Sequence, residues 1–198
     1  MSNDGVNTGR RRFLIATTAV GGGIGAVGVA VPFVKSWNPS EKAKAAGAPA
    51  KADVSKIEPG AMVVAEWRGK PIYLVRRTDE SVGLLDGLAG RLKDPANGNK
   101  AQQPAYADNV TRSRKPEIAV LEGVCTHLGC APKFHPEVKP EPFDSEWKGG
   151  FYCPCHGSRF DLAGRVFNGS PAGANLKVPP YSYLDESTIV IGLDEENS

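Results

Sequence analysis

The sequence predicts an antiparallel β domain carried on a single N-terminal transmembrane helix. Three observations predict it: an uncharged run near the N-terminus, short β-rich segments separated by turn residues, and two compact boxes of cysteine and histidine. The chain has 198 residues and 40% hydrophobic content. That size allows one domain of modest core plus appendages rather than two full domains.

The N-terminal segment contains the membrane signal. Three consecutive arginines, residues 10–12, precede the uncharged run 13–34, which as a helix would span about 33 Å and can cross a bilayer. The arginines followed by Phe-Leu resemble a twin-arginine signal, which exports proteins already folded around cofactors. A cleaved signal peptide is the alternative, but the run is long and lacks an A-x-A cleavage site. We expect a cytoplasmic segment at 1–12 and a retained anchor at 13–34.

Residues 35–53 are rich in Ala, Lys, Gly and Pro, and no apolar face repeats in them. This composition predicts a flexible hinge without a packed element. An inert spacer is the commoner use of such sequences. About 19 residues reach roughly 60 Å when extended, which is enough for a head to move between two partners.

The head, residues 54–198, has the pattern of antiparallel β structure. Segments 62–67 and 71–77 flank the turn Arg68-Gly69-Lys70 and predict a hairpin. Leucines at helical spacing predict a covering helix over 80–93. The polar stretch 94–114 predicts a solvated loop or a partner-contact insertion. Further strands are expected at 117–121, 150–152, 165–167, 181–184 and 188–192.

Charge excludes some functions. Residues 1–50 carry six Lys/Arg against two acids, whereas residues 51–198 carry 18 against 20, so the net charge of +2 comes from the N-terminus. Neither a basic patch interleaved with aromatics nor a phosphate-binding loop occurs, so the sequence gives no support for a nucleic-acid partner or a nucleotide.

The chemistry lies in the two boxes. Residues 125–130 read C-T-H-L-G-C and residues 153–158 read C-P-C-H-G-S, which together hold all four cysteines and two of the three histidines. Two thiolates plus two imidazoles suit either zinc or a two-iron two-sulfur cluster with histidines on one iron. A single zinc site would leave one cysteine of each box unused, which favours the cluster.

Both hexapeptides match the pattern of the Rieske iron-sulfur family, and the chain resembles in particular the disulfide-containing subunit of bacterial cytochrome bc complexes. The resemblance implies an all-β, Rieske-type antiparallel β-sandwich with an inserted helix and a cluster-binding subdomain at about 122–178. It implies one 2Fe-2S cluster. The implied roles are Cys125 and Cys153 on the inner iron, His127 and His156 on the exposed iron, a Cys130 to Cys155 disulfide, Ser158 donating to a sulfide, and His156 as the catalytic residue that meets quinol.

Two positions depart from the family pattern. Many members have Tyr two positions after the box serine, where this chain has Phe160. Fewer hydrogen bonds to the cluster sulfurs predict a midpoint potential toward the low side of the class. The segment 169–176 resembles the family's proline loop over the cluster, but Gly173 stands where a second proline is common, so the sequence leaves the stiffness of this loop open. The 22-residue insert between the boxes, 131–152, is longer than in compact members, and its role is also open.

By this resemblance the chain is the iron-sulfur subunit of a quinol-cytochrome c reductase and is not catalytic alone. It would take an electron and a proton from quinol at cytochrome b and pass the electron to a c-type cytochrome subunit. The expected setting is a dimeric complex among the lipids of a bacterial inner membrane, with the head in the periplasm. Two alternatives are the small Rieske subunit of a periplasmic molybdenum oxidase such as arsenite oxidase, and a soluble ferredoxin of a ring-hydroxylating dioxygenase.

Overall fold

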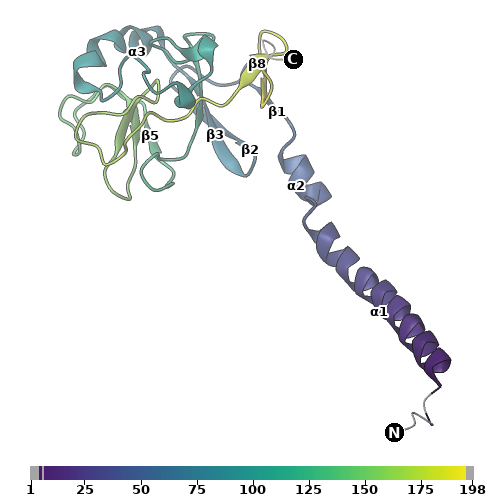
Figure 1. The fold of residues 1–198 in the computed structure, drawn as a ribbon. Helices are drawn as coiled ribbons and strands as arrows, with labels where there is room; N and C mark the ends of the chain where they lie inside the picture. The colour runs from purple at the N-terminus through teal and green to yellow at the C-terminus, as the bar shows by residue number, and fades with distance from the viewer. Residues whose placement is uncertain (1–4, 6, 195–198) are drawn as a thin grey trace. The chain divides into compact units, whose positions relative to one another are not determined.

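The computed structural model describes residue 5 and residues 7–194. It divides into two compact units, Met1–Ala45 and Ala46–Ser198 (Figure 1). The first unit is helical and the second is built mainly from β-strands.

The helical unit consists mostly of α1, Thr8–Ser36. Its N-terminus is capped by the Asn7 side chain, which accepts a hydrogen bond from the Arg10 backbone N–H at 3.1 Å. No residue of this helix is buried against the rest of the protein, and an 18-residue window reaches a mean hydropathy of 1.9. Within the described chain, α1 is therefore one helix that is long and apolar enough to cross a membrane.

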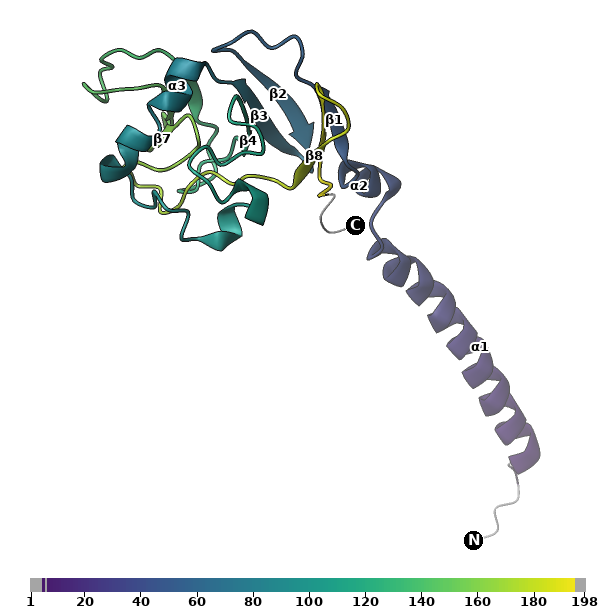
Figure 2. The same ribbon diagram turned by 90° about the horizontal axis from the view of Figure 1, so that it is seen from above.

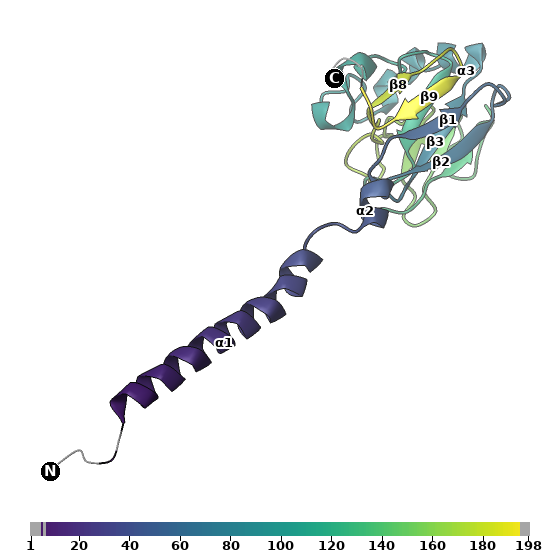
Figure 3. The ribbon, with the colours of Figure 1, turned by 90° about the vertical axis from the view of Figure 1, so that its right-hand side faces the viewer.

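The sequence predicts no packed element between residues 35 and 53, and this prediction is wrong. A short helix, α2, occupies Glu41–Ala46, and strand β1 occupies Ala50–Asp53. Strand β1 pairs antiparallel with β9, Thr188–Ile191, so the last residues assigned to the hinge belong to the head (Figure 3). The strand escapes recognition because its half-buried positions are alanines, Ala50 and Ala52, whose small side chains give no apolar alternation.

Between residues 46 and 194 the structure shows three antiparallel sheets, which confirms the predicted fold class (Figure 2). Each sheet has three strands. The orders are β1-β9-β8, with β8 at Tyr181–Tyr183; β2-β3-β4, with bounds Met62–Trp67, Lys70–Arg76 and Ile118–Glu122; and β5-β6-β7, with bounds Lys133–His135, Gly150–Tyr152 and Arg159–Asp161.

The predicted hairpin is confirmed. Strands β2 and β3 pair with Trp67 opposite Lys70, which leaves a two-residue turn of Arg68 and Gly69. Both residues have positive φ, 52° and 70°, as a type I′ turn requires. The central strand β3 and its neighbour β4 are the most buried, with Ile72, Leu74 and residues 119–121 at 0% exposure. The main core therefore lies against this sheet.

The covering helix predicted at 80–93 is not continuous. A single α-helical turn, α3 at Asp79–Gly83, is followed by a 3-10 helix, η1 at Asp86–Arg91. Glycines at 83, 87 and 90 weaken an α-helix here because each loses more backbone entropy than alanine. The leucines that suggested a helix are nevertheless buried: Leu85, Leu88 and Leu92 are 1–5% exposed.

The segment 94–114 combines exposed residues with buried ones, so it is not a wholly solvated loop, and a contact with a partner stays a prediction. The predicted strand 165–167 is absent. Two short 3-10 helices, η2 at Lys100–Gln102 and η3 at Ala105–Ala107, lead to Arg112, which is 0% exposed and donates to the Ala163 carbonyl at 3.0 Å. A polar sequence hides this burial because the buried groups are hydrogen-bonded. Residues 166 and 167 form isolated bridges instead of a strand.

Candidate metal centre

The two boxes fold in the same way. In each, the N–H of the first cysteine donates to the carbonyl of the last residue, at 2.8 Å for both Cys125 to Cys130 and Cys153 to Ser158. In each, the glycine N–H donates back to the first cysteine carbonyl at 2.9 Å. Gly129 and the second glycine, at position 157, have φ of 84° and 75°, a region that favours glycine. Each box is therefore a closed loop that presents its side chains from a tight turn.

The strands bring these loops together. The first box follows β4 and leads into β5, and the second joins β6 to β7. Because β5 pairs with β6, the two boxes leave one sheet side by side. Cys130 and Cys155 form a disulfide between them, which confirms the predicted pairing. Such a bond persists in an oxidising compartment.

The four predicted ligands divide by burial. Cys125 and Cys153 are free thiols at 3% and 2% exposure, whereas His127 is half-buried and His156 is exposed. Burial raises the pKa of the Cys153 thiol, and the neighbouring Cys125 adds to the shift. The two imidazole rings meet edge to face, with centroids 4.8 Å apart and planes at 89°. The loops thus present two sulfurs inward and two imidazoles outward.

One nitrogen among these donors lacks a partner. Nδ1 of His127 is buried and makes no hydrogen bond within the described part of the chain. Buried polar atoms are normally paired, so a bond to a metal is a direct account of this one. The sulfurs of Cys130, Cys153 and Cys155 lie within 4.8 Å of one another, but Cys130 and Cys155 are joined to each other and cannot ligate. The remaining donor set fits a cluster with two histidines on one iron.

Polar groups of the loop 169–176 contact both boxes. Ser158 Oγ, in a residue at 0% exposure, accepts from the Ala172 N–H at 3.0 Å, which leaves its own proton to donate elsewhere. Thr126 Oγ1 donates to the Ala174 carbonyl. The loop is therefore held over the two boxes by one hydroxyl from each.

Tyr73 of β3 is a functional neighbour that the sequence gives no means to find. Its hydroxyl donates to the Pro132 carbonyl at 2.9 Å, and its ring stacks on Phe151 with centroids 5.6 Å apart. A Cβ at Gly123 would lie 2.3 Å from the same ring. Tyr73 thus contacts three residues next to the boxes. Its ring lies against Gly123, before the first box, and against Phe151, before the second, and its hydroxyl bonds Pro132, after the first. No local motif marks it.

Two family models match the chain. Residues 93–180 match the model described as "Rieske [2Fe-2S] domain", and residues 1–40 match "Ubiquitinol-cytochrome C reductase Fe-S subunit TAT signal". The chain is 54% identical over 194 residues to the ubiquinol-cytochrome c reductase iron-sulfur subunit of Allochromatium vinosum, covering 98% of this chain and 93% of that one. The chain belongs to this family of Rieske iron-sulfur subunits. The corresponding subunit of Blastochloris viridis is 39% identical over 192 residues, covering 96% of this chain and 97% of that one.

A chain of a solved structure titled "Hyperthermophilic respiratory Complex III" is 28% identical to this one, with a TM-score of 0.47, covering 88% of this chain and 97% of that chain. Membership of the family confirms the resemblance found in the sequence and with it a Rieske-type 2Fe-2S cofactor. The twin-arginine prediction is confirmed by the match over residues 1–40, which with α1 makes this a membrane-anchored Rieske protein.

Proposed function

We propose that this Rieske protein is the electron-transfer subunit of a quinol:cytochrome c oxidoreductase, in which it works with cytochrome b and a c-type cytochrome subunit. It takes one electron and a proton from quinol at the cytochrome b site and passes the electron to the cytochrome c subunit. The observation that carries the proposal is the outward pair of imidazoles over two buried thiols, with the disulfide joining their loops.

The proposed role of each site residue follows from its burial and its position. Cys125 and Cys153 would hold the inner iron and His127 and His156 the outer one, and the cluster when bound would supply one-electron chemistry. His156 is exposed, so its ring can accept a hydrogen bond from a quinol hydroxyl and hold the proton. Ser158 is fully buried and keeps a hydroxyl proton free to donate to a sulfur.

The proposed setting is a bacterial inner membrane. Helix α1 crosses the lipid once, residues 1–12 stay in the cytoplasm, and the head lies in the periplasm within a dimeric complex. The Cys130–Cys155 disulfide supports an oxidising compartment, and the basic residues 10–12 before the helix support this orientation.

The hinge proposal now concerns the residues between α1 and β1, 37–49. They contain only the short helix α2, whose Glu41–Lys44 ion pair is exposed and so adds little stability. Prolines at positions 43–46 should stiffen this stretch and slow turnover while leaving the cluster spectrum unchanged. Full turnover in that variant would make the segment an inert spacer.

Low-temperature electron paramagnetic resonance of ascorbate-reduced membranes tests the function directly. We expect a Rieske-type signal that shifts when a quinone-site inhibitor is added, and co-purification with b-type and c-type haems. Molybdenum in place of these haems would favour the arsenite-oxidase type of complex. Purified protein that contains zinc and lacks iron and acid-labile sulfide would overturn the proposal altogether.

A further inference from the structure

The part of the insert that lies between β5 and β6, residues 136–149, has no role in the function described so far. After β5 it turns away and returns to β6, and it places two side chains in the interior of the head. Trp147 is 1% exposed and packs with Leu88, Leu92 and Phe167 in a small separate core. Asp144 has a side chain only 3% exposed. A buried carboxylate needs cations or hydrogen-bond donors as partners, and these partners show which segments the insert contacts.

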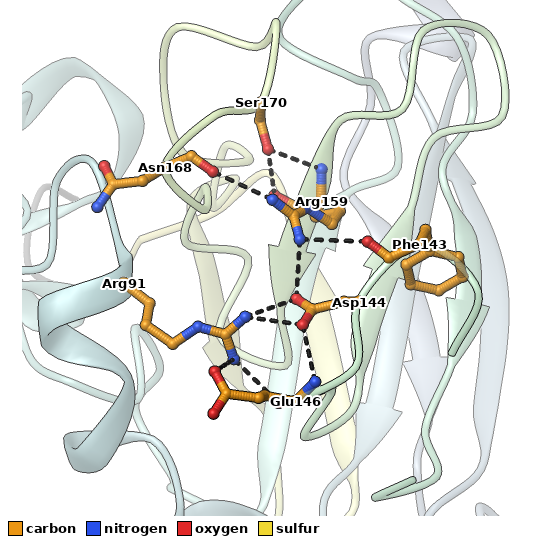
Figure 4. Close-up of polar contacts among 7 residues, drawn as sticks. All are labelled: Arg91, Phe143, Asp144, Glu146, Arg159, Asn168 and Ser170. Carbon is orange, nitrogen blue, oxygen red and sulfur yellow. Dashed lines mark hydrogen bonds and ion pairs between the residues drawn. The ribbon is translucent and has the colours of Figure 1, made fainter. Parts of the chain in front are cut away.

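Two arginines converge on Asp144 (Figure 4). Arg91, at the end of η1, donates from Nη2 to both carboxylate oxygens at 2.8 Å. Arg159 donates from Nη1 to Oδ2 at 2.9 Å, and the Glu146 N–H donates to Oδ1 at 3.0 Å. Although burial alone would raise it, these hydrogen bonds and charges hold the pKa of Asp144 below its ordinary value. The carboxylate is therefore ionised and fully engaged at neutral pH.

Arg159 is the residue directly after the second box. Besides Asp144, its guanidinium donates to the Phe143 carbonyl at 3.3 Å and to the Asn168 carbonyl at 3.2 Å. Its backbone N–H donates to Ser170 Oγ at 3.0 Å (Figure 4). The exit of the second box is thus tied to the insert on one side and to the start of the loop 169–176 on the other.

The entry of the second box is tied to the insert as well. Tyr152 directly precedes Cys153, and the Phe143 ring stacks on it with centroids 4.1 Å apart and planes at 11°. Phe143 and Asp144 are adjacent in the chain, so two consecutive residues of the insert contact the residues that flank the loop 153–158 on either side. The His156 ring is exposed and meets the His127 ring edge to face, so its direction depends mainly on the backbone of this loop.

We infer that the insert is a clamp on the second ligand loop, and that Asp144 is the positioning residue that fixes the loop and with it the orientation of His156. This inference rests on the proposed assignment of Cys153 and His156 as ligands. Asp144 acts through Arg159 and does not itself contact a ligand. The clamp consists of a buried carboxylate between two guanidinium groups, that of Arg91 at the end of η1 and that of Arg159 directly after the loop.

The test is Asp144→Asn in the intact membrane complex. The amide keeps the size of the side chain but replaces one accepting oxygen by a donating NH2 group, so it cannot accept the hydrogen bonds of both arginines and the loop should gain freedom. We expect a broadened, shifted Rieske signal per cluster and quinol oxidation per cluster reduced by about tenfold, since small misplacements of reacting groups have effects of this order. In the purified protein, amide hydrogen exchange at Gly157, whose N–H bonds to the Cys153 carbonyl, should accelerate.

Glu146→Gln is the matched control. Glu146 lies 3.9 Å from Arg91 and its side chain is 76% exposed, so the variant removes a carboxylate beside the same arginine without opening the clamp. It should match wild type in signal, exchange and turnover. Arg159→Lys provides a second route: it keeps the charge but loses the guanidinium that bonds Asp144, Phe143 and Asn168 together, and it should reproduce the Asp144→Asn signal. Combined with Asp144→Asn it should add little further change.

Several outcomes would overturn the clamp while leaving the proposed function intact. In one, Asp144→Asn lowers only thermal stability or cluster content, with signal, exchange and turnover per cluster unchanged. In another, Glu146→Gln alters the signal as much as Asp144→Asn does. If Asp144→Asn does not accumulate, Arg159→Lys decides by the same readouts, and a wild-type signal there refutes the inference. A wild-type protein without any Rieske signal would instead refute the proposed function.

Discussion

Replacing Ser158 by alanine tests the hydrogen bonding around the proposed cluster. The residue has 0% exposure and its oxygen already accepts the Ala172 N–H at 3.0 Å. A buried hydroxyl proton needs an acceptor, so donation to a cluster sulfur is the role that we propose for it. Ser158→Ala removes both hydrogen bonds and adds no bulk.

The loss of each hydrogen bond should change a different quantity, the midpoint potential for one and the free energy of unfolding for the other. A hydrogen bond to a charged group contributes about 1.5–3 kcal/mol, and roughly half of that should distinguish the reduced from the oxidised state. For one electron, 59 mV corresponds to about 1.4 kcal/mol, so the midpoint potential should fall by about 30–65 mV. Separately, the unpaired Ala172 N–H should lower the free energy of unfolding by about 1–3 kcal/mol.

Redox titration followed by electron paramagnetic resonance measures the potential, and quinol oxidation by the complex should slow with it. Ser113→Ala is the control, because that buried hydroxyl accepts from Arg77 at 2.7 Å and its loss should affect stability alone. A potential equal to wild type in Ser158→Ala, or an equal fall in both variants, would refute the reasoning.

Three further variants probe the surrounding structure. Phe160→Tyr should raise the midpoint potential by tens of millivolts, because in the family pattern the hydroxyl at this position points at a cysteine sulfur, and a redox titration showing no rise would contradict this. Gly123→Ala should lower the free energy of unfolding by about 1–3 kcal/mol, since its Cβ would lie 2.3 Å from the Tyr73 ring; an unchanged melting temperature would count against it. Asp161→Asn breaks the fully buried ion pair with Arg165 at 2.8 Å and should destabilise the head by about 3–5 kcal/mol in denaturant unfolding, whereas a loss below about 1 kcal/mol would show that the pair is dispensable.

The features that the sequence predicts well are local ones. The β2–β3 hairpin follows from the β-branched and aromatic residues on either side of a short turn that contains Gly69. The anchor follows from length and lack of charge, and the Cys130–Cys155 disulfide from the family pattern of the boxes. In each case the determining residues lie within a few positions of one another, or within a motif that covers both partners.

The features that escape prediction depend on distant contacts. Strand β1 is recognisable only through its partner β9, more than 130 residues later. From the sequence alone, Arg112 belongs to a polar segment that is expected to be solvated, and its burial is explained only by its hydrogen bond to the Ala163 carbonyl. Tyr73 reaches Pro132 across 59 positions. The proposed role of Asp144 likewise depends on its hydrogen bonds to two arginines in other segments, 53 and 15 residues away. Composition and periodicity carry no information about such pairs.

The loop 169–176 shows how folding can supply what a sequence motif lacks. Gly173 replaces a proline and is itself exposed, so the chain at this point has no ring to restrict it. Its neighbours are fixed instead: Lys93 Nζ donates to the carbonyls of residues 170 and 172 at 2.6 and 2.8 Å, and Ser158 and Thr126 bond residues 172 and 174. Beyond them, Asn175 accepts from the residue 166 N–H at 2.9 Å and donates to the residue 94 carbonyl at 3.1 Å. Because these bonds lie on both sides of Gly173, the loop is constrained by hydrogen bonds from four separate segments rather than by proline, and its stability is therefore coupled to that of both ligand boxes.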